Sequence, residues 1–165
     1  MADQKNGAGV AIANAAAPAL ADTIERWEDL LRAASQSLAA MDPARAEEPI
    51  RDEGWSRKQV LGHTIDSASN NHQRFVRAQI LTELVWPNYD QEPWVESQGY
   101  SAAPWDDLVE FWTLYNKHLL RVVRRIPEEK TTTVCRIGDE APMTLAELIA
   151  SYVRHLEHHL KQILA

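Results

Sequence analysis

The chain has 165 residues, of which 45% are hydrophobic and 25% are charged, a composition typical of one soluble globular domain. Its 24 acidic residues outnumber the 17 basic ones, and the resulting formal charge of -7 argues against nucleic acid or an anionic membrane as a partner. A single cysteine, Cys135, excludes an intramolecular disulfide and fits a reducing compartment, so we expect a cytoplasmic protein.

The alanine-rich start of the chain superficially resembles a signal peptide. However, an acidic residue precedes the first lysine, and Asn14 and Pro18 interrupt the apolar run. We therefore expect residues 1–20 to form a disordered leader and residues 21–165 to form a single domain. No stretch of the sequence is long and apolar enough to predict a membrane span.

Four segments carry apolar residues at helical spacing together with start or stop signals. They run from about Asp22 to Met41, from Ser56 to about Leu84, from Pro104 to about Ile126, and from Thr144 to the chain end. Capping boxes are predicted at three of the starts, by the pairs Asp22 and Glu25, Ser56 and Gln59, and Thr144 and Glu147. Because each apolar stripe must be covered by another, these helices predict an all-α four-helix bundle.

Two connections between these helices have features of their own. The segment from about Val85 to Ala103 is long for a bundle and holds four aromatic residues among prolines. It is either a lid or binding loop, with Trp94 a candidate for the pocket, or a plug that closes one end of the bundle. Residues 131–137 are β-prone and precede a Gly-Asp turn, which makes a short hairpin the candidate structure between the third and fourth helices.

Histidines on the last helix point to a metal. Since each helical residue advances about 100°, His155 and His159 lie within about 40° of each other beside the apolar stripe, whereas His158 points elsewhere. An i, i+4 histidine pair can place two imidazoles on one ion. The alternative is that these are hydrogen-bonded core histidines.

The second helix carries a polar strip through an otherwise apolar surface, formed by His63, Ser67, Asn70 and Arg74. Buried polar groups lower stability unless they are paired, so such a strip is typical of a cavity lining or a polar network. His72 lies nearly opposite and is expected to be exposed. Three histidines around one ion would leave a coordination position open for chemistry.

These residues resemble the DinB superfamily of metalloenzymes. The resemblance rests on Trp55-Ser56 followed by Val60-Leu61-Gly62-His63, on the stretch from Tyr152 to His159, and on Gln162-Ile163. It implies an up-and-down four-helix bundle, often a homodimer, with a divalent metal such as nickel, zinc or iron on three histidines. Carried over to this sequence, the ligands are His63, His155 and His159.

The resemblance also implies a class of reaction, because characterised relatives include bacillithiol transferases and a mycothiol-dependent isomerase. We expect an enzyme that acts on a small molecule, either a transferase using a low-molecular-weight thiol or a hydrolase using metal-bound water. The alternative is a non-enzymatic, stress-associated protein that binds a metal or ligand.

Other residues of the site are weaker candidates. Asn70 and Arg74 are expected to line the substrate pocket, with Arg74 binding an anionic group. Asp66 is a candidate base or ligand-orienting residue, or else a solvated helix position. Cys135 has no histidine near it in the sequence and is a poor candidate nucleophile.

One feature conflicts with the expected topology. In an up-and-down bundle the second and fourth helices are parallel, yet His63 lies about 10 Å beyond its cap and the histidine pair about 20 Å beyond Thr144. A shared ion would then need the fourth helix to be shifted by roughly two turns, or the two helices to cross at an angle.

Overall fold

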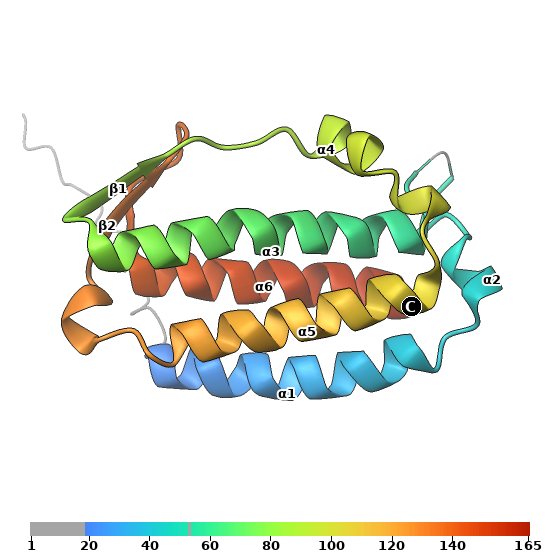
Figure 1. Cartoon of the computed structure of the whole chain (residues 1–165), viewed down its shortest axis with the longest axis horizontal. Helices are drawn as coiled ribbons and strands as arrows, with labels where there is room; N and C mark the ends of the chain where they lie inside the picture. The colour runs from blue at the N-terminus through green and yellow to red at the C-terminus, as the bar shows by residue number, and fades with distance from the viewer. Residues whose placement is uncertain (1–18, 53) are drawn as a thin grey trace, which may run out of the picture.

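The computed structural model describes residues 19–52 and 54–165, so the leader expected at 1–20 falls outside the described residues except for its last two positions. Four long helices form the bundle (Figure 1): α1 Leu20–Ala39, α3 Arg57–Ile80, α5 Trp105–Val123 and α6 Leu145–Leu164. Shorter elements connect them: the helices α2 Pro43–Ala46 and α4 Gln91–Gln98, and the 3-10 turns η1 Tyr100–Ala102 and η2 Glu128–Lys130. The predicted four-helix bundle is confirmed.

Two of the three predicted capping boxes are confirmed. The capping boxes at Ser56 and Thr144 are both present, with the side chains of Gln59 and Glu147 accepting from the cap backbone. The capping box predicted at Asp22 is wrong, because α1 already begins at Leu20 and Asp22 lies inside its first turn. There its carboxylate still complements the helix dipole.

The order of the helices differs from the expected up-and-down arrangement. In Figure 1, α3 and α5 both run from the end of the bundle near α2 toward the end near the sheet, so these two neighbours are parallel. In contrast, α3 and α6 are antiparallel, since Arg57 at the start of α3 contacts Ile163 near the end of α6. The expectation that the second and fourth helices are parallel is therefore wrong.

The cause is the connection between α3 and α5. The second helix was expected to reach Leu84, but α3 ends at Ile80 and the chain forms strand β1 Glu83–Trp86. It then returns along the outside of α3 through α4 and η1, as Figure 1 shows, and α5 starts at the end where α3 started. The segment expected as a long aromatic loop is thus a strap with a strand and a helix of its own.

The β-prone segment forms the short hairpin considered for it, from strands β2 Val134–Ile137 and β3 Met143–Thr144, which pair antiparallel. The turn after β2 places Gly138 at φ 54°, in the left-handed region that favours glycine. An addition to this expectation is β1, which pairs parallel with β2 and makes a three-stranded sheet at one end of the bundle.

Large apolar side chains fill the interior between the four long helices. Trp27, Phe75, Trp112 and Leu156 are almost completely buried, and the Tyr152 hydroxyl donates to Asn116 Oδ1 at 2.7 Å within this core. No helix among residues 19–52 and 54–165 is long and apolar enough to cross a bilayer.

Candidate metal centre

The antiparallel pairing of α3 and α6 brings the three candidate histidines to one level. His63 lies seven residues after Ser56, about 10 Å along α3. His155 and His159 lie ten and six residues before Ala165, on average about 12 Å from the same end of the bundle. A shared ion therefore needs neither the shift of two turns nor the steep crossing that parallel helices would have required.

The imidazoles meet through their Nε2 atoms. His155 Nε2 lies 3.1 Å from His63 Nε2 and 3.0 Å from His159 Nε2. Nitrogen ligands bind zinc at about 2.0–2.1 Å, so two of them on one ion are about 3 Å apart. The three residues therefore have the separation of a shared ligand set, and they form the one cluster of this type among the described residues.

Burial keeps these histidines neutral. Desolvation, with repulsion from His159, lowers the pKa of His63 to about 4, and desolvation with its histidine neighbours lowers the pKa of His155 to about 3. The pKa of His159 is also lowered by burial. Neutral imidazole is the form that binds a metal ion.

Contacts on the far side of two rings orient them. His159 Nδ1 lies 2.9 Å from Gln162 Oε1, which can only accept, so Nδ1 carries the proton and the Nε2 lone pair points inward. His155 Nδ1 lies 3.3 Å from Ser67 Oγ. His63 Nδ1 is buried without a partner in the described part of the chain, and its ring packs against Trp55 at 5.5 Å between centroids.

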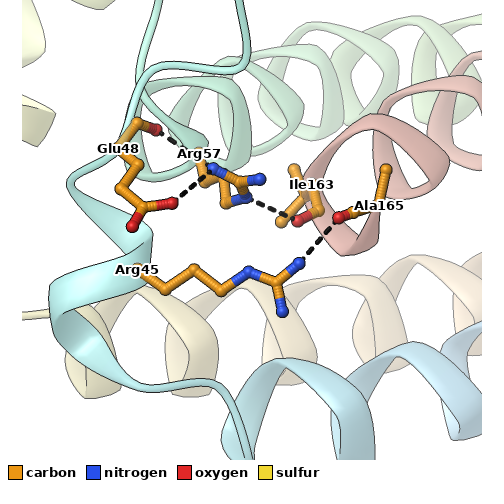
Figure 2. Close-up of polar contacts among 5 residues, drawn as sticks. All are labelled: Arg45, Glu48, Arg57, Ile163 and Ala165. Atoms are coloured by element: carbon orange, nitrogen blue, oxygen red, sulfur yellow. Dashed lines mark hydrogen bonds and ion pairs between the residues drawn. The ribbon is translucent and has the colours of Figure 1, made fainter.

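Two arginines hold the end of α6 (Figure 2). Arg57 Nε donates to Ile163 O at 3.1 Å, and Arg45 donates to Ala165 O at 2.6 Å. Arg57 is itself paired with the Glu48 carboxylate at 3.4 Å. The last carbonyls of a helix lack partners within it. The clamp formed by Arg45 and Arg57 satisfies two of them, and so ties the end of α6, next to His159 and Gln162, to α2 and to the start of α3.

A cavity of about 440 Å³ opens beside the histidines, between α3, α6, the strap and the β2–β3 turn. Its polar lining includes His63, Ser67, Asn71, Arg74, Asn88, Tyr89, Asp90, Gln91, Glu140 and His155. His159 faces a second, smaller pocket of about 240 Å³ beside Trp55 and Gln162. The large cavity has the size of a small-molecule site.

Some of the expected pocket residues lie elsewhere. Arg74 lines the cavity, but Asn70 does not; its amide donates to the Asp66 carbonyl along its own helix. Asn71 lines the cavity instead. The polar strip follows the i, i+4 row from Ser67 to Asn71. Such rows are inclined to the helix axis, whereas the expected strip ran straight along the axis and therefore included Asn70.

The strap contributes a different aromatic residue from the one expected. Trp94 is 37% exposed and packs beside Tyr89, at 5.0 Å between ring centroids, while Tyr89 itself enters the cavity. Burial raises the pKa of Tyr89 to about 12, so its hydroxyl stays protonated. The sequence signal that could have indicated Tyr89 is its place among polar residues just before α4.

Asp66 is neither solvated nor part of the cavity lining. It is 1% exposed, and its Oδ1 accepts from the Tyr100 hydroxyl at 2.6 Å and from Gln98 at 3.2 Å. Burial raises the pKa of this carboxyl. Asp66 therefore anchors the strap on α3, and its position does not favour a role as catalytic base.

Two further expectations concern residues outside the cluster. His72, expected to be exposed, is half-buried, and its Nδ1 lies 3.2 Å from the Tyr115 hydroxyl. Cys135 is fully buried in β2, and burial raises the pKa of its thiol to about 11. A thiol that stays protonated is a poor nucleophile.

Comparisons with known proteins give a family match and relatives over most of the chain. The model of the DinB superfamily matches residues 26–163. Over 149 residues the chain is 29% identical to a protein of Bacillus mycoides (strain KBAB4) named "Putative metal-dependent hydrolase", with 86% of this chain and 84% of that protein covered. A protein of Bacillus cereus (strain AH820) with the same description is 25% identical over 150 residues, covering 88% of this chain and 86% of that protein.

Solved structures share the fold. YfiT from Bacillus subtilis, described as "a probable metal-dependent hydrolase with an unusual four-helix bundle topology", superposes with a TM-score of 0.76 at 21% identity, covering 98% of this chain and 90% of YfiT. The mycothiol-dependent maleylpyruvate isomerase superposes with a TM-score of 0.75 at 16% identity, covering 90% of this chain and 62% of the isomerase.

Proposed function

The chain belongs to the DinB superfamily, and from this membership and its histidine cluster we propose that it is a metal-dependent enzyme acting on a small molecule. The observation that carries the proposal is the convergence of three Nε2 atoms from α3 and α6 beside a cavity that His63 and His155 line. His63, His155 and His159 are the proposed ligands of a divalent ion such as zinc, nickel or iron.

The donor set favours catalysis over a structural metal. Structural zinc sites have four protein ligands, often cysteines, whereas three imidazoles converge in the described residues and the lone Cys135 lies elsewhere in β2. A divalent ion on three imidazoles supplies an open coordination position at which water or a thiol is activated. His63 and His155 both face the cavity, so a substrate bound there is next to that position.

Hydrolysis is the first candidate reaction, because the two Bacillus relatives described above are named as metal-dependent hydrolases. In this reading the protein residues bind and orient the substrate, while the ion activates water. Tyr89, protonated because its pKa is raised, is placed to donate a hydrogen bond to a bound substrate.

Thiol transfer is the second candidate. A cavity of about 440 Å³ lies within the range of small-molecule sites, which is compatible with a low-molecular-weight thiol. A structural neighbour that depends on mycothiol agrees with this reading. The two candidates need the same ion and differ in which nucleophile occupies the open position.

One set of assays tests both candidates. The purified protein is stripped of metal, reloaded separately with zinc, nickel or iron(II), and assayed for hydrolysis of a panel of esters and amides. The same samples are assayed for conjugation of several cellular thiols to an electrophile. We expect turnover in one class that requires metal, is lost in His159→Ala and is kept in His158→Ala. Metal-loaded, folded protein without turnover in either class would support the alternative, a non-enzymatic binding protein.

A further inference from the structure

Arg74 lies in the same cavity as the histidines and forms no ion pair with any described residue. The residue is 6% exposed, and its Nε has no acceptor in the described part of the chain. Its one hydrogen bond there is a long one, from a terminal nitrogen to the Pro87 carbonyl at 3.4 Å. No ion pair of the described residues includes Arg74.

A guanidinium in this position lowers the stability of the empty protein. Arginine keeps its charge in proteins even when buried, and a buried charge without a partner is costly. The side chains that share the cavity wall with it, Asn71, Asn88 and Tyr89, are neutral. Asp90 and Glu140 also line the cavity; both are exposed and neither forms an ion pair with Arg74. Burial lowers the pKa of Arg74, and the charge of Glu140 offsets this effect only in part.

The rest of the cavity indicates what kind of anion fits. Besides its polar residues, the cavity is lined by the apolar side chains of Ile137, Met143 and Leu148. Along α3, Arg74 lies eleven residues beyond His63, about 16 Å between Cα atoms. An elongated organic molecule can therefore reach both ends of the cavity.

We propose that Arg74 binds the carboxylate of an elongated organic acid whose other end lies at the three histidines. This assignment rests on the proposed function for the identity of the reacting end, but the anion site itself does not need the metal. A carboxylate matches the planar donor fork of arginine, and binding at a remote group positions the reacting atom. Glu140, at the rim, weakens the binding of the same anion by repulsion and thereby limits which acids enter the cavity.

Binding to metal-free protein tests the site. Isothermal titration is carried out with hexanoate, with the uncharged hexanamide of the same shape, and with inorganic phosphate. We expect hexanoate to bind, and hexanamide and phosphate to bind at least about tenfold more weakly. Equal affinities for hexanoate and hexanamide would overturn the proposal, and tighter binding of phosphate would overturn the organic class of ligand.

Two substitutions supply matched variants. Arg74→Gln should weaken hexanoate binding by about 10- to 100-fold, and Glu140→Gln, at an exposed position, should strengthen it by about two- to fivefold. Arg74→Met should raise the Tm of the empty protein, since it removes an unpaired buried charge. A lowered Tm together with unchanged hexanoate binding would mark Arg74 as a structural residue and contradict the assignment.

A second experiment tests the link between the anion site and the metal. Cobalt-loaded protein is titrated with mercapto acids of increasing length and with mercapto alcohols of equal length, and thiolate binding is followed by its visible charge-transfer band. We expect a mercapto acid to bind more tightly than its alcohol, and we expect Arg74→Gln to abolish the difference. If the protein fails to bind cobalt but binds hexanoate through Arg74, the proposed function fails while the anion site stands.

Discussion

His63 Nε2 and His155 Nε2 lie 3.1 Å apart although 92 positions separate the two residues in the chain. His159 Nε2 lies 3.0 Å from the same atom of His155. With Nδ1 of His159 protonated toward Gln162, its Nε2 presents a lone pair to the other rings. One proton can join two of the three nitrogens but cannot satisfy all of them, whereas a single cation can.

Removing one imidazole should remove the metal. We expect His159→Ala to reduce bound metal from about one equivalent to a small fraction, because two remaining imidazoles hold an ion weakly. Metal content of the purified protein, measured by plasma mass spectrometry, checks this. The adjacent exposed His158 is the matched control, and His158→Ala should keep full metal content. Equal loss in both variants would point to non-specific binding by the histidine-rich helix.

Gln162 should set metal affinity without touching the ion. Its Oε1 accepts from His159 Nδ1, and loss of such an outer partner typically weakens a metal site by about 10- to 100-fold. We therefore expect Gln162→Ala to lower affinity by that factor in competition with a chromogenic chelator. Lys161→Ala changes an exposed neighbour and should leave the affinity unchanged. An unaltered affinity in Gln162→Ala would show that the ring is oriented by packing alone.

The stability of the metal-free protein should fall in mild acid. The folded pKa values of His63 and His155, about 4 and about 3, lie below the unfolded value of about 6.5. Between those limits the unfolded chain binds more protons than the native one, so the free energy of unfolding decreases as pH falls from about 6.5 toward 4. Each histidine contributes at most about 1.4 kcal/mol per pH unit.

Urea unfolding of the metal-free protein at several pH values measures this slope. Carboxylates also titrate in acid, so the test is the difference between the wild type and His155→Gln. We expect a shallower slope in the variant between pH 6.5 and 4.5. Identical slopes would mean that His155 takes up its proton in the native protein as easily as in the unfolded chain.

Local patterns explain why much of the site was predictable from the sequence. The capping boxes at Ser56 and Thr144 depend on residues three positions apart, and the separation of His158 from His159 depends on helical phase. Both rules use only residues close in the sequence, although the capping rule failed at Asp22, because α1 begins at Leu20. The three-histidine cluster followed from such rules together with the family resemblance.

Features that depend on distant contacts were not predictable in this way. The direction of α5 relative to α3 is decided by β1 pairing with β2, about fifty residues further along the chain. The end of α3 at Ile80 has the same cause. The helical pattern continued to Leu84, but Leu84 lies in β1 and pairs with Cys135 of β2. Burial of Asp66 depends on where the strap places Tyr100.

The clamp on α6 should stabilise the turn that carries His159. Arg57 is half-buried and donates to the Ile163 carbonyl, so we expect Arg57→Ala to reduce the free energy of unfolding by about 1–3 kcal/mol and to speed amide exchange in the last turn of α6. Arg45→Ala removes an exposed contact and should cost less than about 1 kcal/mol. Similar small effects from both would show that packing alone holds the turn.

Gly62 should be required by the ring of Tyr100, which anchors the strap over α3. A Cβ at position 62 would lie 2.2 Å from Tyr100 Cδ2, and the ring cannot retreat freely because its hydroxyl donates to Asp66 at 2.6 Å. We expect Gly62→Ala to cost about 1–3 kcal/mol, since this clash outweighs the gain in helix propensity. In a Tyr100→Ala background the same change should become neutral or stabilising. A cost that is equal in both backgrounds, measured by urea unfolding, would contradict this contact between the strap and the residue preceding His63.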